Sequence, residues 1–331
     1  MKTIIIAEIG VNHNGSLKIA KKLIDEAKKA QVDYVKFQSY ITDKLLVPGT
    51  KLANYQKKTK IKNQFELLKK YELTFSQQKK IFSYCRKKKV NFLSTPFDKK
   101  SLEFIKMLNP KYIKVSSTDL GNIPLLKEIS KSKKKILLST GMSTIEEIKK
   151  SLKELYKHKT KKKDITLLHC HSAYPTLSKD VNLNSMIFLK KKFKLNVGFS
   201  DHSLGIDAAL AAATLGAKVI EKHFTLDKKM RGPDHSSSIN SRELRNLVKS
   251  VRNIEKILGV EKKFLSRIEK QNRIFTKRSI FAFKSIKKGE KFNENNICTK
   301  RPFIGIPSHM WNDVIGKRAT KNFEINEKII L

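Results

Sequence analysis

Two histidines stand at matching places in the sequence, because His202 and His223 each follow a short apolar run. If those runs form neighbouring parallel strands, which lie about 4.8 Å apart, the two imidazoles can bind one divalent cation. Glu8 or Glu221 could supply an oxygen ligand, and such a donor set suits Mn, Fe, Co or Zn acting as a Lewis acid. A lone histidine there would more often be a hydrogen-bonded core residue, but the matched pair favours a metal site.

Two lysines, Lys36 and Lys114, lie within runs that should be buried. Lysine is rarely buried without a partner, so these two are not explained as solvent-facing residues. Together with the hydroxyl groups of Thr95, Ser117 and Ser139, they would form a site for the phosphate or carboxylate groups of an anion. A lysine that forms a Schiff base is the alternative, although two lysines among several hydroxyls are more typical of phosphate binding.

Other polar residues allow more than one interpretation. Asp234, in the loop 231–236, could bind a hydroxyl-rich substrate, or the loop could be an ordinary Gly-Pro turn. We also expect His169 to reach the same site. A Cys–His nucleophile is excluded, because His169 and Cys170 are neighbours on one predicted strand and must face opposite sides of it.

The elements that would position these residues alternate regularly along the chain. Short apolar runs, rich in β-branched residues, are typical of buried parallel strands, and the stretches between them show the three- and four-residue spacing of helices. Eight such units in about 260 residues predict the α/β class and a (β/α)8 TIM barrel, whose strand ends meet at one mouth. An open doubly wound sheet is the alternative, but it would gather its polar residues at one crossover point. The predicted strands cover residues 3–9, 34–37, 90–94, 112–115, 135–139, 165–170, 195–200 and 218–221.

The pattern changes near residue 260. We predict a catalytic barrel over residues 1–260, a charged linker that could be helical over 261–277, and a small β-rich domain over 278–331. Within the barrel, the segment 45–72 is long for a loop between a strand and a helix, so we expect it to cover the mouth.

The composition bounds the class of protein. The chain has 331 residues, with 71 Lys plus Arg against 30 Asp plus Glu and a formal net charge of +41. This charge could indicate a polyanion-binding surface, but only ten of the basic residues are Arg, which nucleic-acid readers favour. A Lys-rich solvated coat is therefore favoured, with no specific nucleic-acid partner. Three cysteines do not suit a paired disulfide framework, and no apolar run approaches the ~20 residues of a membrane span, so we predict a cytoplasmic protein without a membrane partner.

Several stretches also carry a combined signature. They are residues 7–15 (AEIGVNHNG), 35–38 (VKFQ), 92–98 (FLSTPFD), 138–142 (LSTGM), 198–202 (GFSDH), 221–224 (EKHF) and 232–234 (GPD). In this order they resemble the bacterial sialic acid synthases, a family that includes N-acetylneuraminate synthase and N,N'-diacetyllegionaminate synthase. The tail, with KKGE at 287–290 and KRP at 300–302, is similar to that family's antifreeze-protein-like (SAF) domain.

The resemblance implies an enzyme that condenses phosphoenolpyruvate with an N-acetylated hexosamine, either N-acetylmannosamine or 2,4-diacetamido-2,4,6-trideoxymannose, and releases phosphate. It implies Mn²⁺ or Mg²⁺ held by His202 and His223, with Glu8 as the catalytic glutamate. It also implies a domain-swapped homodimer, in which the small domain of one subunit caps the other barrel and Arg301 reaches the partner's sugar. The implied phosphoenolpyruvate contacts are Lys36, Thr95, Lys114, Ser117, Ser139 and Tyr174, and the implied sugar contacts are Gln38 and Asp234.

Two other functions stay open at this point. One is a different metal-dependent TIM-barrel enzyme, such as an aldolase that uses pyruvate, and the other is a basic polyanion-binding protein. The gathering of glutamate, lysine and histidine at predicted strand ends argues against the second. The chain departs from the family pattern at residues 116–119, 171–173 and 303–304, and the last of these departures adjoins Arg301.

Overall fold

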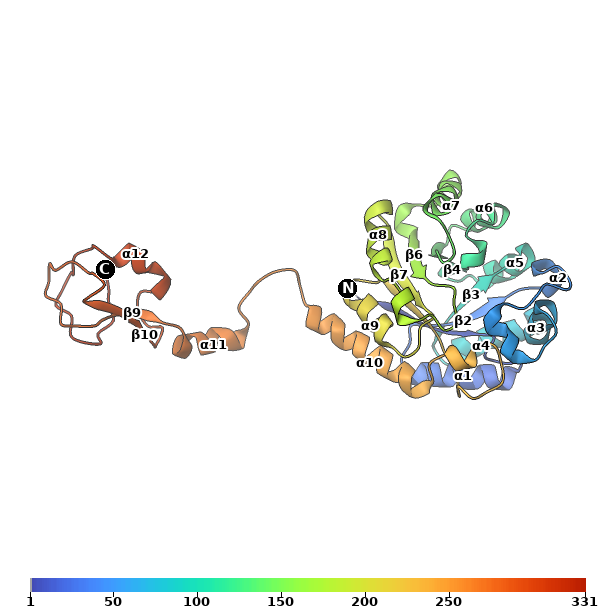
Figure 1. Ribbon diagram of the computed structural model, residues 1–331, viewed down its shortest axis with the longest axis horizontal. Helices are drawn as coiled ribbons and strands as arrows, with labels where there is room; N and C mark the ends of the chain where they lie inside the picture. The colour runs from blue at the N-terminus through green and yellow to red at the C-terminus, as the bar shows by residue number, and fades with distance from the viewer. Residues whose placement is uncertain (1) are drawn as a thin grey trace. The chain divides into compact units, whose positions relative to one another are not determined.

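The computed structural model describes residues 2–331 and divides the chain into two compact units, Met1–Gly259 and Val260–Leu331. Strands and helices alternate through the first unit (Figure 1). Its strands are β1 (Ile4–Gly10), β2 (Tyr34–Ser39), β3 (Asn91–Pro96), β4 (Tyr112–Val115), β5 (Lys135–Ser139), β6 (Ile165–Cys170), β7 (Asn196–Asp201) and β8 (Val219–His223). Its α-helices are α1 (Leu17–Lys29), α2 (Thr42–Leu45), α3 (Gln64–Tyr71), α4 (Phe75–Lys87), α5 (Lys99–Met107), α6 (Ile123–Lys131), α7 (Ile145–Lys157), α8 (Asn184–Phe193), α9 (Asp207–Thr214) and α10 (Ser241–Leu258).

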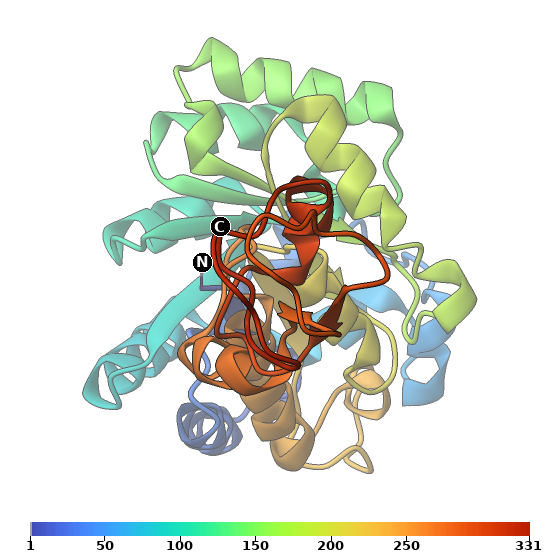
Figure 2. The ribbon, with the colours of Figure 1, turned by 90° about the vertical axis from the view of Figure 1, so that its left-hand side faces the viewer.

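The eight strands form one parallel sheet that curls into a barrel. Their order is β3-β2-β1-β8-β7-β6-β5-β4, and the two end strands, β3 and β4, contact each other. Since β1 pairs with both β2 and β8, the first and last strands are neighbours, which excludes the open doubly wound sheet. The helices lie around the outside of the strands (Figure 2). The predicted (β/α)8 TIM barrel is therefore confirmed.

The helices begin where polar side chains cap them. In α4, the Thr74 hydroxyl accepts a hydrogen bond from the backbone N–H of Gln77, whose side chain accepts one from the backbone N–H of Thr74. Thr144 and Glu147 repeat this arrangement in α7. Such reciprocal bonds satisfy N–H groups that the first turn leaves free.

The interior of the barrel is arranged in layers, because alternate residues of a strand face inward. The lower layer, near the strand starts, is apolar and seals the barrel; it consists of Ile6, Tyr34, Leu93, Leu137, Leu168 and Val219, with Tyr112 packed against it. The residue two positions further along each of these strands lines a polar cavity instead; these are Glu8, Lys36, Thr95, Lys114, Ser139, Cys170 and Glu221. The cavity therefore rests on an apolar floor.

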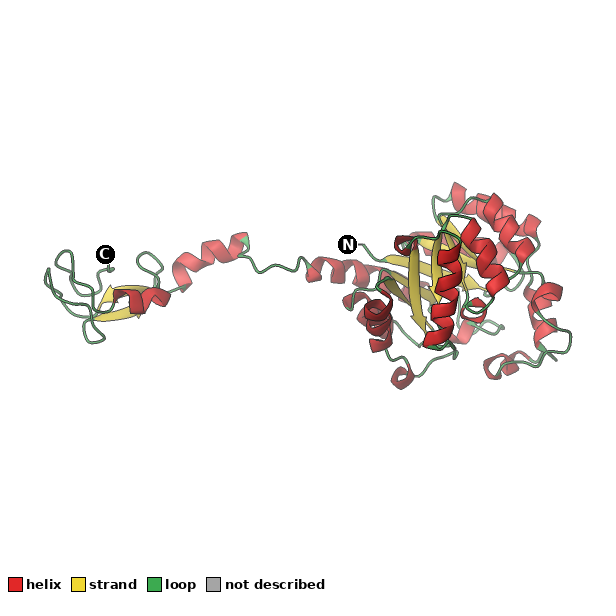
Figure 3. Cartoon of the chain, turned by 90° about the horizontal axis from the view of Figure 1, so that it is seen from above, coloured by secondary structure: helices red, strands yellow, loops and turns green. Residues whose placement is uncertain are grey.

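The second unit has its own small core. It contains α11 (Arg267–Thr276), the antiparallel strands β9 (Ser279–Ala282) and β10 (Ile297–Lys300), and the short helix α12 (Trp311–Val314) (Figure 3). Its apolar cluster includes Ile280, Phe292 and Phe323. Part of the segment expected to be a linker is thus a helix, α11, and it belongs to the second unit.

No helix within residues 2–331 is long and apolar enough to cross a membrane.

Gly198 completes the apolar floor, and it supplies a test of the packing. A Cβ atom at this position would overlap the carbonyl oxygen of Val219 and lie 2.7 Å from Cδ2 of Leu168. We expect Gly198→Ala to lower the free energy of unfolding of the barrel by about 2 kcal/mol, since overpacking a close-packed core typically costs 1–3 kcal/mol. Urea titration followed by circular dichroism measures the change.

The matched control is Gly121→Ala, because a Cβ there meets nothing within 4 Å. It should change the free energy of unfolding by less than about 0.5 kcal/mol. Equal effects of the two substitutions would contradict the close packing at Gly198.

Candidate active site

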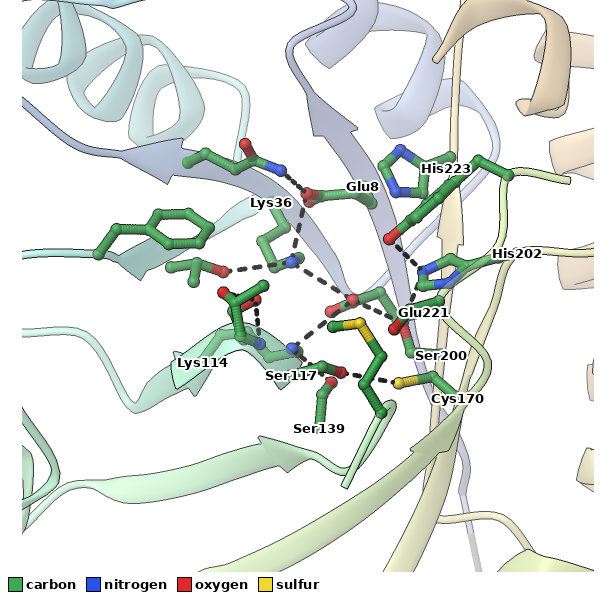
Figure 4. Close-up of a pocket in the computed structure, with 18 of the residues that line it drawn as sticks. Glu8, Lys36, Lys114, Ser117, Ser139, Cys170, Ser200, His202, Glu221 and His223 are labelled. Atoms are coloured by element: carbon green, nitrogen blue, oxygen red, sulfur yellow. Dashed lines mark hydrogen bonds and ion pairs between the residues drawn. The ribbon is translucent and has the colours of Figure 1, made fainter. Parts of the chain in front are cut away.

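A cavity of about 280 Å³ opens at the carboxyl ends of the strands, the end at which TIM barrels place their chemistry (Figure 4). Every strand contributes at least one residue to its wall. Of the predicted site residues, the following line it: Glu8, Lys36, Gln38, Thr95, Lys114, Ser117, Ser139, Tyr174, His202 and His223. One cavity thus brings together ten residues spread over more than 200 positions of the sequence.

A cluster of four buried charges occupies the base of the cavity. The Nζ atom of Lys36 lies 3.3 Å from Oε1 of Glu8 and 3.3 Å from Oε1 of Glu221, and it donates a hydrogen bond to the Thr95 hydroxyl at 3.2 Å. Nζ of Lys114 lies 3.9 Å from Oε1 of Glu221. Two lysines and two glutamates therefore compensate one another away from solvent.

Lys114 is held by further contacts. Its ammonium group donates hydrogen bonds to the Ser139 hydroxyl at 2.6 Å and to the carbonyl oxygen of Val115 at 2.9 Å. Ser117 follows the same strand, and its hydroxyl accepts a hydrogen bond from the N–H of Gly141 at 3.1 Å. An ammonium group with two nearby hydroxyls is the donor set that a phosphate group takes.

The two glutamates differ in their pKa. Burial raises the pKa of Glu8 to about 7, although the charge of Lys36 opposes the rise. Burial would also raise the pKa of Glu221, but Lys114 and Lys36 together outweigh it and lower the value to about 2. At neutral pH Glu221 is therefore a fixed negative charge, whereas Glu8 exchanges its proton readily. Such a divergence separates a structural charge from a group suited to proton transfer.

His202 and His223 face each other above this cluster, with ring centroids 5.5 Å apart. Nδ1 of His202 lies 2.7 Å from the carbonyl oxygen of His171, so Nδ1 carries the proton and the lone pair of Nε2 faces the cavity. Burial lowers the pKa of His202 to about 4, and it lowers the pKa of His223 well below its usual range. Both rings are therefore neutral at pH 7, the form that binds a metal.

One further observation supports metal binding by this pair of rings. Nδ1 of His223 is buried and has no hydrogen-bond partner. No group of three or more His, Cys, Asp or Glu residues within 2–331 is arranged to hold a metal ion. The two imidazoles are thus the candidate ligands that the cavity offers to a divalent cation.

Two tyrosines close one side of the cavity. The Tyr174 ring lies over His202 with centroids 4.2 Å apart, and its hydroxyl lies 3.3 Å from Nε2 of that histidine. The Tyr55 ring packs against Tyr174 at 4.8 Å. Tyr55 belongs to the segment 45–72 and lines the cavity with Ala53 and Gln64 of the same segment. The sequence indicated a covering segment but did not single out Tyr55.

Two expected residues, Asp234 and His169, do not line the cavity. Asp234 lies beside it, with Oδ2 3.8 Å from Nδ1 of His223, and burial raises the pKa of Asp234 to about 7. Since His223 is neutral, the contact is not an ion pair. Arg301 lies in the second unit, where its side chain is exposed. The expectation for His169 was wrong: His169 points out of the barrel, 2.8 Å from the carbonyl oxygen of Val181.

Three further cavity residues, Cys170, Ser200 and Glu221, can be explained by the alternation of side chains along a strand. Cys170, not His169, lines the cavity, because Leu168 belongs to the floor layer and the inward positions differ by two. Ser200 precedes His202 by two positions, and its hydroxyl donates to Oε1 of Glu221 at 2.9 Å. Glu221, considered only as a metal ligand, instead lies between the two lysines. Ser200 and Glu221 stand two positions before His202 and His223, so the alternation of strand residues would have identified both.

Comparison with known proteins agrees with this arrangement. Residues 23–263 match the NeuB family, and residues 277–329 match the SAF domain. The chain is 46% identical, over 99% of both chains, to N,N'-diacetyllegionaminic acid synthase of Campylobacter jejuni. It is 37% identical to a pseudaminic acid synthase of the same species, over 99% of this chain and 95% of that one.

A solved structure shares the architecture. It is the N-acetylneuraminic acid synthetase of Leptospira borgpetersenii in complex with citrate, which is 33% identical, has a TM-score of 0.74 and covers 82% of this chain and 90% of its own. The fold is thus shared with a protein named as a sialic acid synthetase, and the sequence with proteins named as legionaminic and pseudaminic acid synthases. On this evidence the chain belongs to the NeuB family of synthases.

Proposed function

We propose that the protein condenses phosphoenolpyruvate with an N-acetylated hexosamine to form a nine-carbon acidic sugar and inorganic phosphate. The observation that carries the proposal is the buried pair Lys36 and Lys114, ringed by hydroxyls and placed directly below two neutral histidines. One substrate must then be a compact anion, and the other must meet it at the histidines.

Phosphoenolpyruvate suits the lower part of the cavity. Its phosphate and carboxylate need cations that do not exchange with solvent, and both lysines are at least 95% buried. Lys114, Ser117 and Ser139 supply donors for the phosphate, while Lys36 and Thr95 supply donors for the carboxylate. Fixed donors of this kind also stabilise the charge that collects on the leaving phosphate.

His202 and His223 would hold a divalent cation, with Mn²⁺ or Mg²⁺ as the proposed ions. The cation, when bound, supplies Lewis acidity toward the aldehyde oxygen of the open-chain sugar. The carbonyl oxygen of His171 keeps His202 in the tautomer that presents Nε2, and Tyr174 packs over the ring so that its orientation is fixed. Gln38 and Asp234 border this region and are the proposed hydroxyl contacts of the sugar.

The bonds change in two steps. The C3 carbon of phosphoenolpyruvate attacks the aldehyde carbon, the new C–C bond forms, and the aldehyde oxygen takes up a proton. Water then adds to the cationic C2, and the C–O bond to phosphate breaks, so that the phosphate leaves with the electron pair. Oε1 of Glu8 accepts a hydrogen bond from the Gln38 side chain and lies 3.3 Å from Nζ of Lys36, whereas Oε2 has no hydrogen-bond partner. We assign Glu8 the removal of the proton from that water.

The relatives favour one sugar. The 46% identical relative is named as an N,N'-diacetyllegionaminic acid synthase. We therefore rank 2,4-diacetamido-2,4,6-trideoxymannose ahead of N-acetylmannosamine as the substrate. A cytoplasmic location is part of the proposal, because phosphoenolpyruvate is an intracellular metabolite.

We also propose a homodimer in which the second unit of one subunit reaches the partner's cavity with Arg301. The segment between α10 and β9 exposes large apolar side chains to solvent, including Val260, Phe264, Ile268 and Phe275, each more than half exposed. An exposed apolar segment of this kind is usually covered by a partner.

The reaction can be tested directly. Purified protein, phosphoenolpyruvate, Mn²⁺ and either sugar should release phosphate and give a product whose mass is the sum of the two substrates plus water minus phosphoric acid. Chelation of the metal should abolish the release, and addition of Mn²⁺ should restore it. Turnover of pyruvate without phosphate release would instead identify an aldolase.

Glu8 should give the reaction a pH dependence. Its pKa of about 7 means that it is mainly protonated near pH 6 and mainly ionised near pH 8, so a base role requires kcat/KM to rise across this interval. Glu8→Gln should lower kcat by about 10²- to 10⁴-fold and remove the inflection near pH 7. The control is Asp234→Asn, which removes the neighbouring carboxyl group whose pKa is also about 7 and should keep the inflection if Glu8 is its source. A Glu8→Gln profile that retains the inflection would contradict the assignment.

The exchange of Arg301 between subunits predicts complementation. Glu8→Gln and Arg301→Ala variants should each be nearly inactive alone. When they are unfolded, mixed in equal amounts and refolded together, half of the dimers carry one intact site, so about one quarter of the wild-type activity should return. No recovery, although sedimentation shows mixed dimers, would mean that Arg301 serves its own subunit.

A further inference from the structure

Lysines are unevenly distributed between the two ends of the barrel strands. A lysine stands within the two residues before seven of the eight strands, namely Lys2, Lys89, Lys111, Lys134, Lys163, Lys194 and Lys218. No lysine or arginine stands within the two residues after any of these strands. With 61 Lys in 331 residues, chance would put a lysine in about one such pair of positions in three, so composition alone does not explain the contrast.

Helix dipoles explain only part of the excess of lysine at the end of the barrel where the strands start. The helices of the barrel end here, and basic residues in their last turns, such as Lys131 and Lys157, offset about half a negative charge per helix. The loops beyond α6 and α7 add Lys133, Lys159 and Lys161, which are exposed and belong to no helix. The excess positive charge therefore exceeds what the helix ends require.

Two grooves lie along this end. The larger, of about 670 Å³, runs between the loops that enter β5 and β6; seven lysines and His158 line it against one acidic residue, Asp164. The other, of about 600 Å³, is lined by Lys2, Lys28, Lys29 and Lys89 at the entrances of β1 to β3. Its acidic residue, Asp33, already has cationic partners in Lys2 and Arg252.

The two grooves lie on one arc. Since β3 contacts β4 and β4 pairs with β5, Lys111 at the entrance of β4 lies between Lys89 and the lysines before β5. An arc of cations across successive strands suits an extended anion better than a compact one. Neither groove lining contains arginine or an aromatic side chain other than His158. Lysine binds phosphate as a point charge, and without aromatic rings the grooves offer no stacking surface for bases.

We propose that this end of the barrel, opposite the active site, binds a linear chain of phosphates, and that its lysine side chains contact only the phosphate groups of that chain. Inorganic polyphosphate and single-stranded nucleic acid share that chemistry. The site does not depend on the proposed synthase activity, because its residues lie at the strand starts and the cavity residues lie at the strand ends.

The test is a fluorescence anisotropy titration of full-length protein with labelled polyphosphate and with a labelled oligouridylate, at several salt concentrations. Wild-type protein should bind with a dissociation constant in the micromolar range at about 50 mM salt and should weaken steeply as salt rises. A fourfold variant, Lys133→Gln, Lys159→Gln, Lys161→Gln and Lys163→Gln, should bind about tenfold more weakly or worse. Its slope of log K against log salt should be smaller by about 3.

The matched control removes the same number of charges from the N-terminal halves of α1 and α4, away from the two grooves. Its substitutions, all at exposed positions, are Lys18→Gln, Lys22→Gln, Lys79→Gln and Lys80→Gln. It should bind within about twofold of wild type. Both variants should keep the wild-type unfolding midpoint and the wild-type phosphate release, which distinguishes a failure of this proposal from a failure of the synthase. Each of the four groove substitutions made singly provides a second series if the combined variant unfolds.

The outcomes decide the question. Binding of polyphosphate and oligouridylate alike supports recognition of phosphates alone, and binding of only one identifies the source. Equal weakening in the groove and control variants would show a general lysine coat and overturn the proposal. The absence of binding at low salt, or binding to vesicles of anionic lipid but not to either chain, would overturn it as well.

Discussion

The architecture of the mouth depends on the balance of charge among Lys36, Lys114, Glu8 and Glu221. Two ammonium groups cannot remain charged in a closed barrel unless carboxylates accompany them, and removing one member of such a cluster typically costs several kcal/mol. The balance is not symmetrical, because Glu221 contacts both lysines and Ser200, whereas Glu8 contacts one lysine. Because of this asymmetry the pKa of Glu221 is lowered and Glu221 stays ionised, whereas the pKa of Glu8 is raised to about 7.

The apolar floor makes this balance possible. Leu137, Leu168 and their neighbours fill the barrel below the charges, so that the ammonium groups lie close to their carboxylate and hydroxyl partners and away from water. In a medium of low effective dielectric constant the four charges interact strongly, and hydrogen-bond donors held in place would not need to reorganise to bind the proposed anionic substrate. The neutral histidines lie above the charges, so that the apolar floor, the charged cluster and the histidine rings follow one another along the barrel.

Much of this order could be predicted from the sequence, because strand residues alternate and the alternation is visible. Lys36, Lys114 and His223 were placed correctly in the cavity since each lies in or at the end of an apolar run. The prediction failed for His169, because the inward-facing positions of that strand were assigned one residue too early. The ion pairs of Glu221 with Lys36 and Lys114 were not predicted, because they depend on two other strands. Tyr55 could not be found, because the path of a long loop is set by the residues it meets. The proposed role of Arg301 depends on the proposed association of two subunits, which cannot be predicted from the local sequence pattern.

The two-residue rhythm of the strands has a consequence for how the protein can change over evolutionary time. Chemistry is concentrated at the strand exits, in a few inward positions each constrained by several neighbours. The residues at the strand entrances and helix ends are mostly exposed and have fewer neighbours. A substitution at the entrances therefore disturbs few contacts, whereas a substitution at the exits disturbs several. The fold in this way allows the two poles of the barrel to change independently of each other.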